Sequence, residues 1–258
     1  MSFIFDGYST EALGHTATLR RLPSFQGLQL ETLEAPGTDG KFLGGATRSE
    51  AAYVFDTIIH GTSVADAHSK RDALALALDP DRGERWLSFD AAPGWRWLAI
   101  PSGVIDWERL TWDAGAGFQL RADITFAALQ AYGRLVDDEQ WSWASPGSRT
   151  VARSQGNARS YPTVEIEGTL TAGQSVTVTI GGVTVTVPGP LTSGQTLRLD
   201  YDTFEFARWS GATKLASVVR GMTSLDRAEL WPNTTTTFNV ATTGTVTGVT
   251  LLSNARRQ

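Results

Sequence analysis

Residues 176–187 read VTVTIGGVTVTV, an alternation of apolar residues with threonine that is interrupted by Gly181-Gly182. A two-residue Gly-Gly loop suits the primed turn of a tight β-hairpin. The alternation predicts that apolar side chains pair on one face and threonines on the other. A slip of one residue would move the valines into water, so the register is fixed. The expected apolar pairs are Val176 with Val187, Val178 with Val185, and Ile180 with Val183.

The apolar face of this hairpin must pack on a second sheet. Further short strands follow, separated by turn residues such as Pro188-Gly189-Pro190 and Trp231-Pro232-Asn233. Several short strands at this spacing are typical of an antiparallel β-sandwich of about 100 residues. The expected strands cover residues 196–201, 203–209, 216–220, 236–241 and 246–252.

The segment before the sandwich has the composition of a connector. Residues 145–160 are rich in Ser, Gly, Arg, Asn and Gln, and Tyr161-Pro162 ends them. Proline removes a backbone donor and fits the first residue of a strand. A long polar stretch between two patterned regions is typical of a domain boundary. We therefore expect a first domain at residues 1–139, a connector at 140–160 and the sandwich at 161–258.

The first domain reads as mostly β with one inserted helix. Ser63 can cap a helix over residues 64–78, with Asp66 in its first turn and Asp79-Pro80 at its end. The expected strands include residues 52–59, a hairpin of 85–90 with 95–100, and residues 104–112 and 118–126. Residues 34–45 form a turn-rich loop, and Gly40-Lys41-Phe42 lacks the Ser or Thr of a phosphate-binding loop. The predicted fold class is mainly β, with this β-rich domain preceding the sandwich.

Composition narrows the classes of function. The chain of 258 residues has no cysteine, which excludes disulfides, thiolate metal sites and cysteine nucleophiles. Its net charge of −5 argues against tight sequence-independent nucleic-acid binding. No apolar run approaches the ~20 residues that cross a bilayer. The start, MSFIFDGYSTEALGH, lacks the pattern of a secretory signal, so we expect synthesis in a cytoplasm.

No set of residues predicts catalysis, and we expect no catalytic, cofactor or metal site. His15, His60 and His68 lack metal-ligand spacing. Asp200, Asp202 and Glu205 could serve a glycosidase or hold Ca²⁺, although a β-turn favours Asp on its own account. Three aromatic residues of the sandwich could either stack on sugar rings or belong to the core: Tyr201, Trp209 and Trp231.

Several short motifs, in their order and spacing, resemble the distal tail (Dit) proteins of bacteriophages with long non-contractile tails. They are Phe5-Asp6-Gly7-Tyr8, Ala35-Pro36-Gly37-Thr38-Asp39-Gly40, the single helix before Asp79-Pro80, Trp86-Leu87-Ser88-Phe89-Asp90, the segment 126–132, and the run from Asn157 to Ile166. The resemblance covers nearly the whole chain and implies that the sandwich is galectin-like.

The resemblance further implies a non-enzymatic virion protein at the distal end of a tail. Its first domains would form a hexameric ring around a channel for DNA. Its partners would be the tail tube protein, a tail-associated hub or lysin protein and receptor-binding or other baseplate proteins, with no specific nucleic acid and no membrane insertion. Candidate ring contacts are Pro36, Gly37, Asp39, Gly40, Lys41, Val64, Ala67 and Arg71.

Two other functions stay open at this point. The sandwich could be a carbohydrate-binding module that attaches the tail tip to host-surface glycans through Tyr201, Trp209 or Trp231. A glycoside hydrolase would need two carboxylates facing a cleft, for which Asp202 and Glu205 are the candidates.

Overall fold

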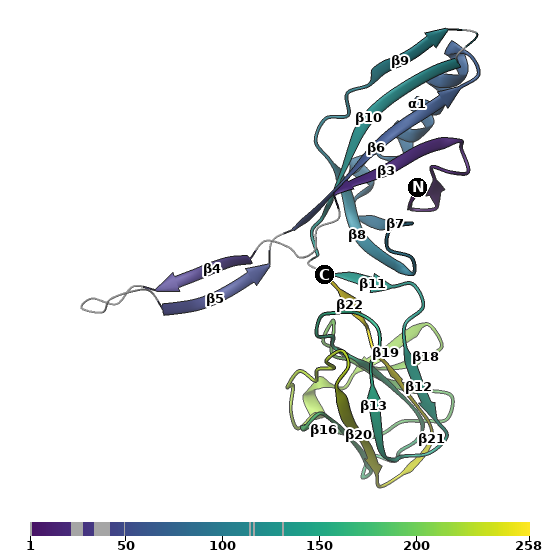
Figure 1. Ribbon diagram of the computed structural model, residues 1–258. Coiled ribbons are helices and arrows are strands. Elements are labelled where there is room, and N and C mark those ends of the chain that lie inside the picture. Colours follow the sequence, from purple (N-terminus) through teal and green to yellow (C-terminus); the bar gives the residue numbers. More distant parts are fainter. Residues whose placement is uncertain are drawn as a thin grey trace. The chain divides into compact units, whose positions relative to one another are not determined.

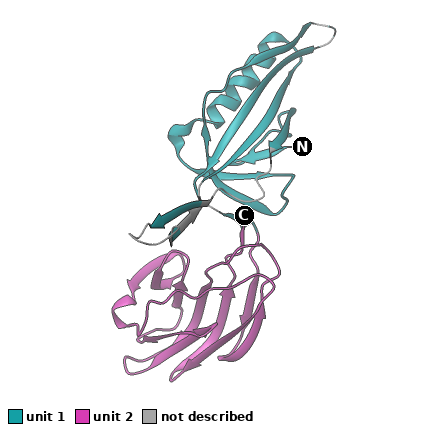
Figure 2. Ribbon diagram, turned by 60° about the vertical axis from the view of Figure 1, so that its left-hand side comes forward, with its two compact units in different colours: residues 1–136, 258 teal, residues 137–257 magenta. Residues whose placement is uncertain are grey.

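The computed structural model describes residues 2–21, 28–33, 42–48, 50–113, 115, 117–130 and 132–258 (Figure 1). The chain divides into two compact units, residues 1–136 with 258 and residues 137–257 (Figure 2). Strands dominate both units, and the predicted mainly β fold class is confirmed. No helix among the described residues is long and apolar enough to span a membrane.

Unit 1 is built on one strongly bent sheet with the strand order β2-β1-β7-β8-β10-β6-β3. Strand β9 pairs with β10, and β11 pairs with β8. Among the described residues, two further strands, β4 (Leu28–Leu33) and β5 (Phe42–Arg48), pair only with each other. The strands of the main sheet are β1 (Phe3–Phe5), β2 (Tyr8–Ser9), β3 (His15–Arg21), β6 (Ala51–Gly61), β7 (Arg85–Phe89), β8 (Trp95–Ser102), β9 (Glu108–Asp113), β10 (Gly117–Ala128) and β11 (Gly133–Leu135).

Helix α1 (Val64–Ala77) lies against β6 and β10, as predicted for residues 64–78. The Ser63 hydroxyl accepts a hydrogen bond from Asp66 N at 3.1 Å, which caps the helix. A Cβ on Gly61 would lie 2.6 Å from the Ala67 Cβ, so glycine is required where the helix meets β6. A 3₁₀ turn, Pro80–Arg82, follows the helix.

Aromatic rings from strands β1, β6, β7, β8 and β10 pack against one another inside unit 1. Phe3 and Phe55 have ring centroids 4.9 Å apart, and Phe89 stacks on Trp97 at 4.8 Å. Phe126 contacts both Phe3 and Phe55. All five rings are at most 5% exposed, so they form the core of this unit.

His15 belongs to the buried side of β3. It is 5% exposed, and its Nε2 lies 3.2 Å from the Tyr8 hydroxyl. Burial, followed by the nearby Lys70 and His60, lowers the pKa of His15 from 6.5 to about 4. The imidazole is therefore neutral in the folded protein at neutral pH.

Unit 2 is a sandwich of a six-stranded sheet, β12-β21-β14-β17-β18-β19, and a four-stranded sheet, β13-β20-β15-β16. Its strands are β12 (Gln140–Trp143), β13 (Gly147–Ala152), β14 (Thr163–Thr169), β15 (Ser175–Ile180), β16 (Val183–Pro188), β17 (Thr196–Asp200), β18 (Glu205–Ser210), β19 (Thr213–Ser217), β20 (Thr235–Thr242) and β21 (Thr245–Leu252). A 3₁₀ turn, Val219–Gly221, and a short strand, β22 (Arg256–Arg257), complete the unit.

The hairpin of residues 176–187 has the predicted register. Val176, Val178 and Ile180 pair with Val187, Val185 and Val183. The hydroxyls of Thr177 and Thr186 lie 2.9 Å apart on the opposite face, and those of Thr179 and Thr184 lie 3.0 Å apart. The alternation therefore assigned each side chain of this hairpin to the correct face.

The predicted connector at 140–160 is wrong. Residues 140–143 and 147–152 form β12 and β13, which are outermost strands of the two sheets. Trp141 and Trp143 pack against the core of the sandwich, and Val151 is 2% exposed. These two strands have only three apolar side chains packed on the core, so their composition resembles that of a linker.

Three predicted strand boundaries also need correction. The strand expected at 104–112 begins only at Glu108, since residues 104–107 have no regular secondary structure. The strand expected at 203–209 begins at Glu205, because a turn occupies residues 203 and 204. The strand expected at 216–220 is instead β19, Thr213–Ser217, followed by the 3₁₀ turn.

Val178→Thr should lower the free energy of unfolding by about 1–3 kcal/mol, because it buries a hydroxyl without a partner at nearly constant volume. Thr184→Val, on the exposed face of the same hairpin, should change it by less than about 0.5 kcal/mol. Urea unfolding of both variants measures the difference. Equal effects would contradict the assignment of faces.

His15→Gln should remove a pH dependence of stability. Unfolded His15 takes up a proton near pH 6.5, whereas the folded residue does so only near 4. Wild-type stability should therefore fall as pH is lowered from about 6.5 to about 4. The variant should lack this component in thermal unfolding across that window, and His60→Gln, at an exposed histidine on β6, should retain it. An unchanged pH profile in His15→Gln would overturn the assignment.

Candidate functional site: the polar sheet face of unit 1

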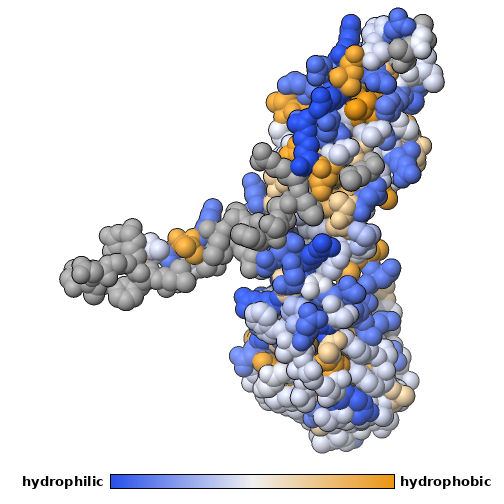
Figure 3. Space-filling model, in the orientation of Figure 1, coloured by the Kyte–Doolittle hydropathy of each residue, from blue (hydrophilic) through white to orange (hydrophobic). Residues whose placement is uncertain are grey.

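Strands β3, β6, β10 and β9 present a polar face on the side away from α1. Along β6, Phe55, Thr57 and Ile59 are buried, while the alternate residue Asp56 points outward. The same alternation leaves Arg121 and Asp123 of β10 on the outer side. This polar sheet face is defined by Thr16, Thr18, Arg20, Asp56, Glu108, Arg121 and Asp123. Figure 1 draws it in front of α1, and Figure 3 shows strongly hydrophilic residues on the same side.

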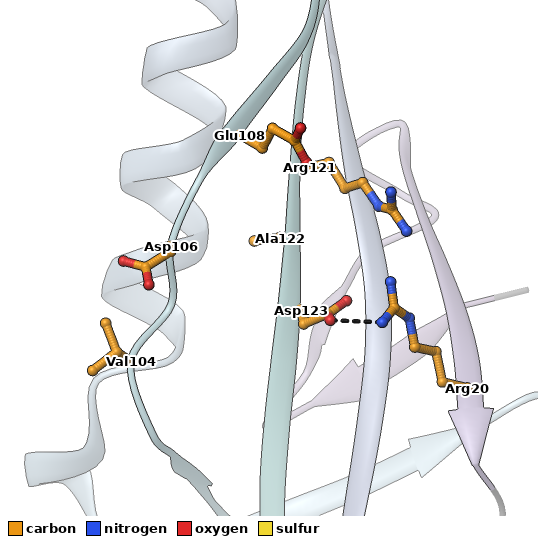
Figure 4. A pocket seen from close by; sticks show the side chains of 7 residues that line it. All are labelled: Arg20, Val104, Asp106, Glu108, Arg121, Ala122 and Asp123. Carbon is orange, nitrogen blue, oxygen red and sulfur yellow. Dashed lines mark ion pairs between the residues drawn. The ribbon is translucent and has the colours of Figure 1, made fainter.

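Asp56 is the common acceptor of a charge network across three strands. Arg121 donates from Nε to Oδ1 at 2.8 Å and from Nη2 to Oδ2 at 2.6 Å, a two-point contact. Arg20 lies 3.4 Å from Asp56 Oδ2. It also pairs with Asp123 Oδ2 at 2.8 Å (Figure 4). The hydrogen bonds from Arg121 hold the pKa of the Asp56 carboxyl below its ordinary value and raise the pKa of Arg121. Both arginines are thus engaged by carboxylates of the same face.

A hollow of ≈ 350 Å³ opens beside this network. Its lining is Arg20, Val104, Asp106, Glu108, Arg121, Ala122 and Asp123 (Figure 4). Together with Asp56, four carboxylates stand here against two arginines. The local field is therefore negative, which is unfavourable for a polyanion.

The sheet formed by these four strands has two open edges, at β3 and at β9. Among the described residues, β3 pairs only with β6, and β9 pairs only with β10. Each edge presents backbone N–H and C=O groups without a strand partner, which makes it a template for pairing with another chain. Leu110, 42% exposed, is the extra residue of a bulge on β9.

Comparisons with known proteins agree with this architecture. Residues 15–117 match the Sipho_tail family, described as a phage tail protein RIFT-related domain. The Dit (gp 19.1) protein of phage SPP1, a paradigm of the hub adsorption apparatus in phages infecting Gram-positive bacteria, is similar at a TM-score of 0.70. Sequence identity is 12%, and the match covers 98% of each chain. The chain has the fold of this Dit protein.

The predicted resemblance to Dit proteins is thereby confirmed. A chain of the phage P2 baseplate in its activated conformation with Ca is similar at a TM-score of 0.48 and 8% identity, over 100% of this chain and 97% of that one. That likeness is too low to carry an argument. No curated protein matches the chain by sequence.

The candidate ring contacts of this Dit-fold chain have different positions. Pro36, Gly37, Asp39, Gly40 and Lys41 lie outside the described residues. Val64 is 40% exposed, and Arg71 donates to Asp72 on the helix surface. Ala67 is fully buried against Gly61, so it is not available to a partner. Of the helix candidates, only Val64 and Arg71 reach the surface.

The three aromatic residues considered as sugar contacts in the sandwich differ in their exposure. Tyr201 is 1% exposed and packs on Phe206, and burial raises its pKa to about 12. It belongs to the core and cannot stack on a sugar. Trp209 is half-buried on β18, and Trp231 is 51% exposed outside the strands.

The three carboxylates near the β17–β18 turn form hydrogen bonds or ion pairs within the protein. Asp200 Oδ1 accepts hydrogen bonds from Asp202 N at 2.9 Å and Thr203 N at 3.1 Å, which shapes the turn. Asp202 pairs with Arg256, and Glu205 pairs with Lys214 at 2.6 Å. Within the described ranges, no cluster of His, Asp and Glu has the geometry of a metal site.

Asp56→Asn should lower the free energy of unfolding by about 1 kcal/mol, because two arginines lose their charged acceptor. Since the network lowers the pKa of Asp56, this difference should be present above pH 3.8 and shrink as pH falls below it. Asp123→Asn, which removes one partner of Arg20 only, should cost less than about 0.5 kcal/mol. Chemical unfolding between pH 3 and 7 measures both, and equal costs would contradict the central place of Asp56.

Proposed function

We propose that this chain is a non-enzymatic structural hub at the distal end of a phage tail, in which the first units of six copies form a ring around a channel for DNA. The tail-protein domain at residues 15–117 and the Dit fold support the setting. The observation that carries the ring is a single sheet with two open edges and a charge-paired outer face.

Edge-to-edge pairing gives the geometry of closure. When β3 of one copy adds to β9 of the next, the contact is head-to-tail, and such contacts close into rings when the rotation permits. Six copies of a four-stranded sheet would form a barrel of about 24 strands, which is wide enough for an aqueous lumen. Closure would also satisfy the edge groups of β3 and β9, whose exposure in a monomer is a liability.

Only the polar sheet face is suited to line the lumen. The opposite face of the sheet is covered by α1 and packed with aromatic rings. Protein grips DNA mainly by placing arginine and lysine on phosphates. On the polar sheet face, Arg20 and Arg121 are already bound to Asp56 and Asp123, so a passing duplex finds few cations.

The β4–β5 hairpin supplies a second reason for assembly. It pairs with no other strand of the described residues, and Leu30 and Leu33 are 56% and 64% exposed. An isolated two-stranded hairpin is marginal in water unless an apolar surface covers it. A neighbouring copy or an adjacent tail protein is the partner that such a hairpin requires.

The remaining partners follow from the position of a hub. The ring would receive the tail tube protein on one face and a tail-associated hub or lysin protein on the other. Receptor-binding or other baseplate proteins would attach through the galectin-like sandwich. The protein would be made in the host cytoplasm and end in the virion.

The purified protein should form closed rings with an open centre, seen as six times the chain mass in solution and as rings in negative stain. Leu110→Asp adds a charge beside Glu108 at the β9 edge and should give a monomer with an unchanged melting temperature. Leu215→Asp is the matched control, because Leu215 is 46% exposed on β19, the outer strand of a sheet in unit 2.

Retention of rings by Leu110→Asp would show that the β9 edge is not the interface. A wild-type monomer at every concentration, also after addition of the neighbouring tail proteins, would contradict the ring itself.

A further inference from the structure

The outer face of the six-stranded sheet in unit 2 carries a row of chemically distinct side chains. Glu167 of β14 lies opposite Gly248 on one side and Thr196 on the other. Thr196 lies opposite Trp209, and Trp209 lies opposite Lys214. Neighbouring positions on these strands, such as Ile166 and Leu197, are buried in the core, so the row points away from it. We call Gly248, Glu167, Thr196, Trp209 and Lys214 the cross-strand row.

Two β-bulges flank the cross-strand row. Between Glu167 and Gly168 the register on β21 skips Thr247, and between Arg208 and Trp209 the register on β19 skips Leu215. Bulges re-aim side chains and are frequent beside binding sites. Glu167 lies close to the backbone of Gly248, because a Cβ at this glycine would lie 3.1 Å from Glu167 Oε2.

The surface around Glu167 is hollowed on two sides. One hollow of ≈ 250 Å³ is lined by Glu167, Gly168, Thr169, Ser193, Gly194, Gln195, Thr196 and Thr247. A second hollow of ≈ 240 Å³ shares Glu167 and Thr247 and extends to Ser142, Glu165 and Thr250. Hydroxyls, carboxylates and backbone dominate both linings. These hollows are suited to a polar ligand with many hydroxyl groups rather than to an apolar one.

Two charged side chains of this face, Glu167 and Arg198, keep unused hydrogen-bonding capacity. Glu167 is exposed, and none of the ion pairs among the described residues includes it. Trp209 Nε1 is buried without a hydrogen-bond partner, so the indole can offer only its ring to a ligand. Arg198, next to the row, lies 3.7 Å from Glu165 and 3.9 Å from Asp200, beyond hydrogen-bond length. A carboxylate accepts and a guanidinium donates at two points, which matches adjacent sugar hydroxyls.

The charges of this face disfavour anionic ligands. Four carboxylates, Glu165, Glu167, Asp200 and Glu205, stand against Arg198 and Lys214, and Lys214 is held by Glu205 at 2.6 Å. A polyanion such as a nucleic acid or a polyol phosphate would be repelled. The row crosses five strands, about 19 Å at the usual strand spacing, which suits a short oligosaccharide better than a single sugar.

We propose that this face binds a neutral oligosaccharide, with the Trp209 indole stacking on the apolar side of one ring and Glu167, Thr196 and Arg198 hydrogen-bonding to hydroxyls of the chain. Tryptophan suits this role because its ring is a broad apolar surface. The site lies wholly within unit 2 and does not depend on ring formation.

The test is binding of the full-length protein to an array of neutral di- to tetrasaccharides built from glucose, galactose, mannose and N-acetylglucosamine, with polyglycerol phosphate as the anionic probe. Calorimetry on the best neutral ligand then compares variants. Trp209→Ala and Glu167→Gln should each weaken binding about tenfold or more, and Trp209→Phe should retain most of it. Trp231→Ala, which removes an exposed tryptophan outside the sheet, should bind as the wild type does.

Three results would overturn the proposal: no binding to any neutral saccharide, binding to polyglycerol phosphate alone, or loss of binding in Trp231→Ala but not in Trp209→Ala. Thermal unfolding separates loss of binding from loss of fold, with Trp209→Phe as the conservative variant. The mass of the same samples in solution reports the ring independently, so either idea can fail without the other.

Discussion

The antiparallel ladder between β6 and β10 decides the structure of unit 1. It joins eleven residue pairs in unbroken register, from Phe118 with Gly61 to Ala128 with Ala51. Side chains alternate across a strand, so this register alone sends Phe55 and Ile124 inward and Asp56 and Arg121 outward. A slip of one residue would expose the aromatic core and bury two charges. The helix, the core and the charge network therefore all depend on one pairing.

The sequence predicted the elements whose patterns are local. The hairpin of residues 176–187 and the helix after Ser63 have regular periods and defined turn or cap residues, and both were placed correctly. The strands at 140–143 and 147–152 were missed because they are outermost strands with few buried side chains. Trp141 and Trp143 were the available signal, since tryptophans two residues apart in a polar stretch are typical of a strand with one buried face.

The charge network could not be predicted from the sequence alone. Arg20, Asp56 and Arg121 come from three strands and meet only because β3 and β10 flank β6. Alternation shows that each points outward but not which strands are neighbours. The bulge between Leu19 and Arg21 further displaces Arg20 from the simple pairing. The cross-strand row of unit 2 has the same origin, since its five residues come from five strands. The sequence left open whether Tyr201 contacts a sugar or belongs to the core, and its exposure of 1% places it in the core.

The outer sheet faces of the two units differ in how their charged side chains are paired. On the polar sheet face of unit 1, arginine donors are used by carboxylates at 2.6 and 2.8 Å, which leaves little for a passing molecule. On the outer face of the six-stranded sheet in unit 2, Arg198 stays 3.7 Å from its nearest carboxylate, and the exposed Glu167 is in no ion pair among the described residues. A surface whose charged groups are paired with one another has few donors and acceptors left for another molecule. A surface with unpaired donors and acceptors can form hydrogen bonds to a ligand. The proposed channel calls for the first kind of surface and the proposed saccharide site for the second, and this chain keeps the two on separate units.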